Sequence, residues 1–289
     1  MTVARAPRPA RYGSRMRSAV RSARAYAASA VRIARRGDLS LVGREERLVF
    51  VVGSPRSGTS FTGAALGAQP GFVDLDEVTP LKAALPRLAG LPTEQAAREL
   101  RAILERVRTL GLARGLRGVE QTPETSFVLE AALRAYPEAR AVHVMRDGRD
   151  VVCSLLERGW LSAARTGADD ARNRYGAHAR FWVEPDRQDE FERASEVRRA
   201  AWAWRRYVTA AAVAPSRTTA LRYEALVESP HAEADRVAAE LGSDPAPLRQ
   251  AFGAVHGSSR GRWQRDLTRE QLAEVESEAG AELAALGYE

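Results

Sequence analysis

Lysine and cysteine are scarce in this sequence of 289 residues. Lysine occurs only at Lys82, although the chain has 44 basic residues, so arginine supplies nearly all of the positive charge. The single cysteine, Cys153, excludes an intramolecular disulfide and is typical of a reducing compartment. No apolar run approaches the length of a membrane span, and the N-terminus lacks the apolar core of a signal peptide. We therefore expect a cytoplasmic protein.

The positive charge is concentrated at the N-terminus. Residues 1–37 contain ten arginines and no acidic residue, so the net charge of +7 becomes −3 over the remaining residues. Because the excess charge is confined to this segment and no nucleic-acid recognition motif follows it, we expect no nucleic-acid partner.

Small and apolar residues recur at helical spacing between Met16 and Ala34, with arginines between them. This pattern predicts a basic amphipathic helix. It lacks the bulky residues that drive membrane insertion, so we expect a solvated or loosely packed arm over residues 1–40, with weak contact to a membrane surface as the alternative. Residues 41–289 are long enough for one domain with a full core. The sequence does not indicate an oligomeric state.

The sequence R-L-V-F-V-V-G-S-P-R-S-G-T-S-F-T over residues 47–62 is the most informative segment of the chain. Apolar residues 48–52 predict a strand that leads into Gly53, and a helix-compatible segment follows Gly58. The backbone N–H groups at the start of that helix would favour an anion. The segment is therefore typical of a loop that holds a phosphate or a sulfate.

The loop has the glycine spacing of a phosphate-binding P-loop, but Thr59 occupies the position of its lysine. A nucleotide hydrolase uses that lysine together with Mg²⁺ to neutralise phosphate charge. Here the loop has one cation, Arg56, whose planar guanidinium suits two oxygens of one anionic group. A sulfuryl group carries a single charge, so we expect this loop to work without a metal ion.

Strands and helices alternate along the predicted domain. Further strands are expected at residues 139–147 and 218–223, which predicts an α/β fold with a parallel, P-loop-like sheet flanked by helices. Sites in such sheets lie beyond the carboxyl ends of the strands, where the loop at 54–60 and the segment 146–150 both fall. The polar segment 160–197 is either a flap over an acceptor or a mobile insert.

Arg146 ends one predicted strand, and Ser154 follows it two turns into the next helix. Both side chains can reach one phosphate from these positions. The alternative is an ion-paired strand end, in which Asp147, Arg149 and Asp150 bind one another. The presence of the P-loop variant upstream favours the phosphate site.

These two segments resemble those of sulfotransferases that use 3′-phosphoadenosine 5′-phosphosulfate (PAPS), in the form found in tyrosylprotein and many bacterial sulfotransferases. The resemblance implies a 5′-phosphosulfate loop at G-S-P-R-S-G-T-S and a 3′-phosphate site at Arg146 and Ser154. It extends more weakly to L-R-Y-E-A-L-V-E-S-P, with Tyr223 near the adenine. It also extends weakly to a basic loop late in the chain, G-S-S-R-G-R-W at residues 257–263, called the late loop below. The implied cofactor-binding residues are Ser54, Pro55, Arg56, Ser57, Gly58, Thr59, Ser60, Arg146, Ser154, Tyr223, Ser259, Arg260 and Arg262.

Transfer to a hydroxyl requires a base within hydrogen-bond reach of its proton. Glu77 lies where sulfotransferases similar to the tyrosylprotein enzymes carry their glutamate base, and Asp76 and Asp74 compete with it. His178 and His256 are weaker alternatives. Arg56 would stabilise the charge that develops on the transferring group.

The sequence departs from the resembled pattern at Gln121, where related enzymes commonly have a lysine directed at the active site. Glutamine can donate hydrogen bonds there but supplies no charge. We predict a PAPS-dependent sulfotransferase that acts on a hydroxyl of a small molecule, without metal. The alternatives are a P-loop kinase or nucleotide hydrolase, and a non-catalytic 3′,5′-nucleotide-binding protein.

Overall fold

The computed structural model describes residues 12–35, 48–110 and 117–288. Its centre is one five-stranded sheet in which every pair of neighbouring strands is parallel, as the sequence predicts. In chain order the strands are β1 (Val49–Val52), β2 (Phe72–Asp76), β3 (Arg117–Glu120), β4 (Arg140–Met145) and β5 (Thr218–Arg222). Their spatial order is β2-β3-β1-β4-β5, which places β1 in the middle of the sheet.

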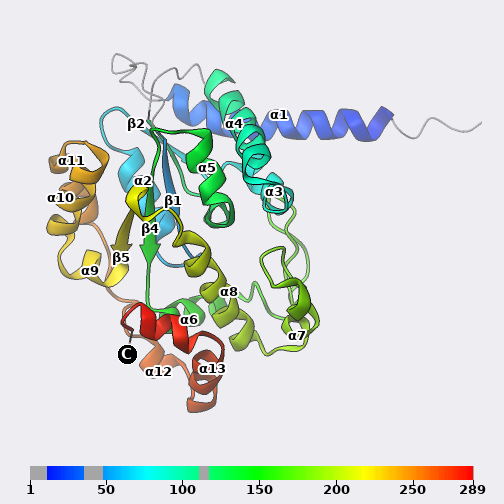
Figure 1. Cartoon of the computed structure of the whole chain (residues 1–289), viewed down its shortest axis with the longest axis vertical. Coiled ribbons are helices and arrows are strands. Elements are labelled where there is room, and N and C mark those ends of the chain that lie inside the picture. Colours follow the sequence, from blue (N-terminus) through cyan, green and yellow to red (C-terminus); the bar gives the residue numbers. More distant parts are fainter. Residues whose placement is uncertain (1–11, 36–47, 111–116, 289) are drawn as a thin grey trace, which may run out of the picture.

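Helices connect the strands and cover both faces of the sheet (Figure 1). The α-helices are α1 (Tyr12–Ala34), α2 (Thr59–Gly67), α3 (Thr79–Leu88), α4 (Thr93–Leu110), α5 (Leu129–Ala135), α6 (Gly148–Arg158), α7 (Gln188–Arg193), α8 (Glu196–Ala211), α9 (Tyr223–Glu228), α10 (Pro230–Leu241), α11 (Pro245–Phe252), α12 (Trp263–Asp266) and α13 (Arg269–Ala285). None of the described helices is both long and apolar enough to span a bilayer.

The central strand β1 is buried on both faces because successive side chains point to opposite sides of a sheet. Val49 and Val51 pack into a core with α2, α10 and α11. Phe50 and Val52 pack into the opposite core, with α3, α4 and α5. A third core joins α6, α8 and α13 around Trp202 and Trp204. It lies beyond the carboxyl end of β4 (Figure 1).

The packing of α1 differs from the solvated arm that its sequence predicts. Tyr26, Ser29 and Ile33 are buried at helical spacing, while Val31 is 45% exposed. The buried face therefore differs from the face of small residues expected between Met16 and Ala34. Tyr26 and Ile33 offer more apolar area than those alanines, and they join the core beside α3 and α4. The predicted boundary at residue 40 lies outside the described residues.

Two helices of different kinds follow β3. Residues Pro123–Val128 form a 3₁₀ helix, and α5 begins only at Leu129. In the 3₁₀ helix, Ser126 accepts a hydrogen bond from the backbone N–H of Gly53 at 3.1 Å. This contact holds the 3₁₀ helix against the start of the glycine loop.

Candidate active site

The glycine loop follows β1 at the carboxyl end of the sheet. Gly53 has φ of +137°, and a Cβ atom there would lie 2.3 Å from the carbonyl oxygen of Val144, so only glycine fits this crossing. Gly58 precedes α2 with φ of +102° and provides no side chain to cap the helix. The first backbone N–H groups of α2 are therefore left without a side-chain acceptor, which suits an anion.

The two predicted phosphate segments meet directly. Arg56, in the left-handed region with φ of +73°, donates from Nε to Ser154 Oγ at 2.9 Å. Arg146 in turn donates to the carbonyl oxygen of Arg56 at 3.1 Å. Burial lowers the pKa of Arg56, and the nearby cations Arg158 and Arg146 lower it further. This excess of positive charge beside the loop favours an anionic ligand.

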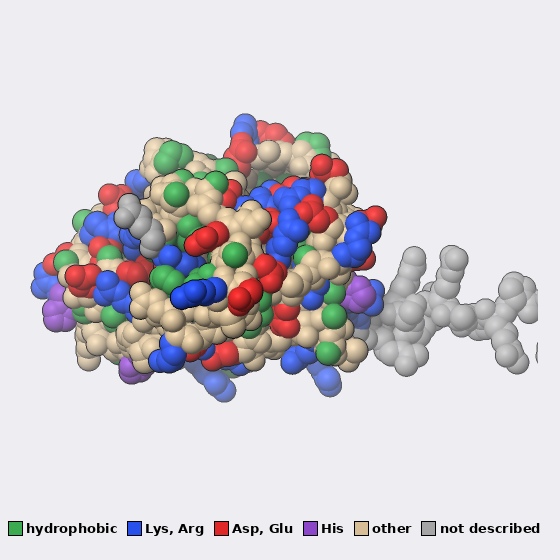
Figure 2. Space-filling view, turned by 90° about the horizontal axis from the view of Figure 1, so that it is seen from below, with side chains coloured by type: hydrophobic (Ala, Val, Ile, Leu, Met, Phe, Trp, Pro, Cys, Tyr) green, Lys and Arg blue, Asp and Glu red, His purple; other side chains and the backbone are tan. Residues whose placement is uncertain are grey.

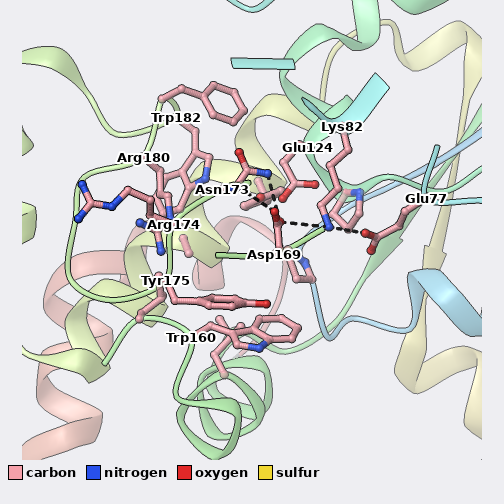
Figure 3. Close-up of a pocket in the computed structure, with 17 residues that line it drawn as sticks. Glu77, Lys82, Glu124, Trp160, Asp169, Asn173, Arg174, Tyr175, Arg180 and Trp182 are labelled. Atoms are coloured by element: carbon pink, nitrogen blue, oxygen red, sulfur yellow. Dashed lines mark hydrogen bonds and ion pairs between the residues drawn. The ribbon is translucent and has the colours of Figure 1, made fainter. Parts of the chain in front are cut away.

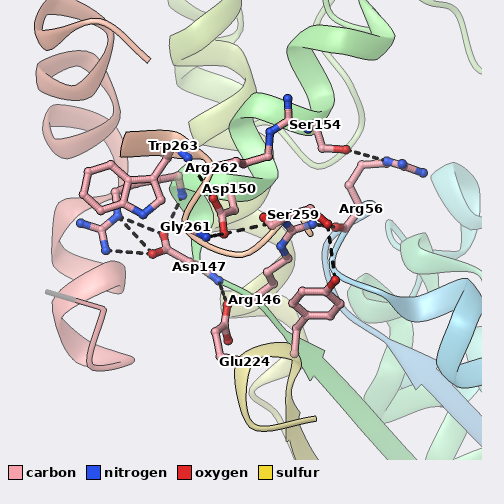
Figure 4. A network of polar contacts seen from close by, with 12 residues as sticks. Arg56, Arg146, Asp147, Asp150, Ser154, Glu224, Ser259, Gly261, Arg262 and Trp263 are labelled. Atoms are coloured by element: carbon pink, nitrogen blue, oxygen red, sulfur yellow. Dashed lines mark hydrogen bonds and ion pairs between the residues drawn. The ribbon is translucent and has the colours of Figure 1, made fainter. Parts of the chain in front are cut away.

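Arg146 is buried at the end of β4, and three groups besides the carbonyl of Arg56 contact it (Figure 4). Asp150 lies 3.6 Å away, the ring of Tyr223 lies 4.7 Å from the guanidinium carbon, and the carbonyl of Ser259 accepts a hydrogen bond. Within the described part of the chain, the Nε atom of Arg146 has no hydrogen-bond partner. A buried donor of this kind is available to a ligand oxygen.

The alternative ion-paired arrangement is present beside this site. Asp147 and Arg149 form a salt bridge at 2.8 Å. Asp150, however, accepts from the backbone N–H groups of Gly261 and Trp263, at 2.8 and 3.1 Å (Figure 4). The acidic residues thus fix the strand end and the late loop, while Arg146 and Ser154 face Arg56.

The late loop contributes unequally to this cluster. Ser259 Oγ lies 3.4 Å from the Tyr223 hydroxyl, which also donates to the carbonyl of His256 at 2.5 Å. Arg260 is 47% exposed and lies 3.6 Å from Glu228. Arg262 is ion-paired with Glu157 and Asp266. Ser259 and Tyr223 therefore join Arg146, whereas both late arginines are directed at carboxylates of their own.

A cavity of about 160 Å³ adjoins the glycine loop through Pro55 (Figure 3). Much of its wall comes from residues 160–182, so the polar segment that the sequence marks as a flap or an insert lies over the cavity. The lining residues are Pro55, Glu77, Lys82, Pro123, Glu124, Leu155, Trp160, Leu161, Asp169, Asn173, Arg174, Tyr175, Arg180, Phe181, Trp182, Ala203 and Tyr207.

Lys82 is the functional candidate that the sequence analysis missed. Its Nζ atom lies 2.5 Å from Glu77 and 3.3 Å from both Asp169 and Asp170. Burial disfavours the Lys82 cation, but Glu124, Glu77 and Asp169 outweigh that effect and raise its pKa. The signal available in the sequence was that this is the only lysine of an arginine-rich chain.

The model of the sulfotransferase family matches residues 93–246, which is more than half of the chain. The chain belongs to the sulfotransferase family. The match starts after the glycine loop, so the loop is an independent indication of the same kind of protein. A comparison with curated proteins finds no match.

Solved structures share the fold of this sulfotransferase. The sulfotransferase domain from the curacin biosynthetic pathway is 14% identical, with a TM-score of 0.53, over 86% of this chain and 99% of that chain. Sulfotransferase STF9 from Mycobacterium avium is 15% identical, with a TM-score of 0.50, over 96% of this chain and 87% of that chain.

The three acidic residues at the end of β2 occupy different places in this sulfotransferase. Glu77 lines the cavity. Asp76, with φ of +57°, accepts from Gln121 Nε2 and from Arg32, both at 2.5 Å. Asp74 accepts from the backbone N–H of Asp76 and also lies near Arg32, at 3.6 Å. Gln121 thus binds Asp76 and not a group in the cavity, and of the three carboxylates Glu77 alone lines it.

The histidines lie around the sulfotransferase site without entering its centre. His143 is buried in β4, and burial lowers its pKa to about 4, as suits a core residue. His178 contacts Arg174 at 3.0 Å, and His256 is exposed. Neither of the two alternative bases lines the cavity.

Glu120, which is buried, and Glu124, which lines the cavity, are two further carboxylates near the site. Glu120 accepts from the backbone N–H of Thr122 at 3.0 Å and from the hydroxyls of Thr122 and Thr125. Burial nevertheless raises its pKa to about 7. Burial also raises the pKa of Glu124, against the effect of Lys82. On the face of the molecule seen in Figure 2, basic and acidic side chains are interspersed.

Proposed function

We propose that this sulfotransferase uses PAPS as donor and transfers its sulfuryl group to a hydroxyl of a small-molecule acceptor. The observation that carries this proposal is the contact of Arg56 with Ser154 and Arg146. It joins a glycine loop suited to a 5′-phosphosulfate with a strand end suited to a 3′-phosphate. The cavity that holds Glu77 adjoins the same loop.

The donor would be held by two groups of residues. The loop from Ser54 to Ser60 would bind the 5′-phosphosulfate through the backbone N–H groups at the start of α2. Arg146 and Ser154 would bind the 3′-phosphate, and the unpartnered Nε of Arg146 supports this assignment. Tyr223 and Ser259 would complete the nucleotide site. Arg260 and Arg262 would take part only if they left their present carboxylate partners.

In the proposed reaction Glu77 accepts the proton of the acceptor hydroxyl as its oxygen forms a bond to sulfur. The bond between sulfur and the bridging oxygen of the donor breaks, and its electron pair stays on the departing 5′-phosphate. Arg56 is placed to stabilise this developing charge. Lys82 is ion-paired with Glu77 and would supply a second cation beside the loop.

A calorimetric titration tests the donor site. We expect 3′-phosphoadenosine 5′-phosphate (PAP) to bind much more tightly than AMP, and Ser154→Ala or Arg146→Ala to remove most of that preference. Ser216→Ala, at an exposed position far from the loop, is the matched serine control. Equal binding of PAP and AMP would refute the PAPS proposal and favour a kinase or hydrolase.

Activity tests the base. Glu77→Gln keeps the size of the side chain but removes its proton acceptor, so we expect sulfation to fall about 10²-fold or more while PAP binding is retained. PAP binding without sulfation of any acceptor by the wild type would instead favour the non-catalytic nucleotide-binding protein.

A further inference from the structure

Most charged side chains of the cavity wall lie in two groups, one that contains an ion pair and one that contains two arginines. Glu77 and Lys82 lie on one side in Figure 3, and Arg174 and Arg180 lie on the other. Asp169 stands between them and is directed at Lys82 and Asn173, at 3.3 and 3.1 Å. Glu77 and Asp169 are therefore engaged with the single lysine, whereas Oε2 of Glu124, another residue of the wall, has no hydrogen-bond partner within the described part of the chain.

The two arginines differ from most arginines around them because their partners are neutral. Arg180 donates to the carbonyls of His178 and Gly176, at 2.8 and 3.4 Å, and Arg174 contacts the His178 ring. The described part of the chain offers neither guanidinium a carboxylate within ion-pair distance. Arg187, Arg198 and Arg205, on the neighbouring helices, all bind carboxylates.

Arg180 is also partly buried. Burial lowers its pKa, which means that the surroundings disfavour its positive charge. Electrostatic interactions with Tyr207 and Asp169 act in the opposite direction and raise the pKa of Arg180, but neither residue is hydrogen-bonded to its guanidinium. An anionic ligand could accept hydrogen bonds from the N–H donors of this guanidinium that remain unused, and its negative charge would stabilise the arginine cation.

Aromatic side chains line the space between the two charged sides. They are Trp160, Tyr175, Phe181, Trp182 and Tyr207. An apolar cavity of about 150 Å³ holds one benzene molecule, and this cavity measures about 160 Å³. The wall therefore suits a single flat ring.

We propose that the acceptor is a one-ring hydroxy compound that bears an anionic group, such as a carboxylate, opposite its hydroxyl. The hydroxyl lies at Glu77 and the anionic group at Arg180, with Arg174 in support. This inference rests on the proposed function, since Glu77 is assigned there. A cationic group at that end of the acceptor is disfavoured because Arg180 and Arg174 would repel it.

The test compares three compounds of one shape and different charge. 4-Hydroxybenzoate, 4-hydroxybenzamide and 4-(aminomethyl)phenol are titrated calorimetrically into the protein saturated with PAP. We expect the carboxylate to bind at least about tenfold more tightly than the amide, as a charge-assisted hydrogen bond provides, and the amine to bind most weakly. Equal affinities, a preference for the amine or no binding of any of the three would overturn the inference.

Variants of Arg180 test whether the anionic group of the acceptor binds at this residue. Arg180→Gln should reduce the affinity for the carboxylate about tenfold or more and leave the affinity for the amide within about twofold. Arg180→Lys should restore part of the preference. Arg193→Gln, an exposed position on α7 outside the cavity, should leave both affinities unchanged. An Arg180→Gln variant with the wild-type preference would overturn the inference.

PAP affinity is measured first on the same preparations, so that the two proposals fail separately. Loss of the preference for PAP over AMP refutes the donor assignment alone, and the three compounds are then titrated without PAP. Normal PAP binding without a preference for the carboxylate refutes only the acceptor class.

Discussion

Lys82 lies among several carboxylates at the candidate site. It is buried and compensates the charges of Glu77, Asp169 and the partly buried Glu124. We expect Lys82→Met to lower the free energy of unfolding by about 3 kcal/mol, because it leaves these carboxylates unpaired, and to abolish most activity. Lys82→Arg should retain much of the stability. Urea unfolding and sulfation assays on both variants check this, and a fully stable Lys82→Met variant would contradict it.

The raised pKa of Glu120 predicts that the free energy of unfolding depends on pH. Its pKa is about 7 in the folded protein against an ordinary value of 4.5. Between these values the folded state holds a proton that the unfolded state has released, so the free energy of unfolding falls as pH rises through this window. Over the same rise in pH, the free energy of unfolding of the Glu120→Gln variant should fall by less than that of the wild type, with a difference on the order of 3 kcal/mol. Urea unfolding at pH 4 to 8 measures the difference, and parallel profiles would speak against it.

At the scale of elements, α1 is part of the fold and not an appendage. Ile33 is 1% exposed in the core beside α3 and α4, whereas Val31 is 45% exposed two residues earlier. We expect Ile33→Ala to cost about 2–4 kcal/mol of unfolding free energy. Val31→Ala, the matched control on the same helix, should change it by less than about 0.5 kcal/mol. Equal effects would mean that α1 does not pack as described.

The glycine loop is the second element whose geometry can be tested. A Cβ atom on Gly53 would lie 2.3 Å from the carbonyl of Val144, and the backbone there is in a region that favours glycine. We expect Gly53→Ala to displace the loop and weaken PAP binding at least about tenfold. Gly71→Ala is the control, since it also has positive φ but open space around it. Retained PAP affinity in Gly53→Ala would contradict the described loop.

At the scale of the whole molecule, the site lies where three cores meet. The loop comes from the sheet, Lys82 from α3 and the aromatic wall from the segment before α8. Under the proposed function, the cations that these parts would bring to the transferring group are Arg56 and Lys82. Because a sulfuryl group carries one charge, we expect activity within about twofold of normal in excess EDTA. A loss that added Mg²⁺ restores would contradict the expected independence from metal.

The sequence by itself determined the sheet and the glycine loop. Both depend on neighbouring residues: apolar strands, the glycines at 53 and 58, and Arg146 at a strand end. The likeness of these segments to sulfotransferases was therefore readable, and the family match confirms the sulfotransferase family, while the solved structures confirm the fold. Glu77 was named among three carboxylates, but its spacing could not separate it from Asp76 and Asp74.

Only the tertiary structure decided which of these groups meet. The cavity joins residues from position 55 to position 207, and no local pattern encodes such contacts. The left-handed backbone at Asp76 turns its carboxylate to Gln121 and Arg32, leaving Glu77 for the cavity. The same long-range packing buries Tyr26 and Ile33 of α1 and places Lys82 among acids. Ion pairs and cores of this kind form between chain segments that are distant in sequence. The sequence therefore indicated the class of reaction, and only the tertiary structure showed which side chains lie together.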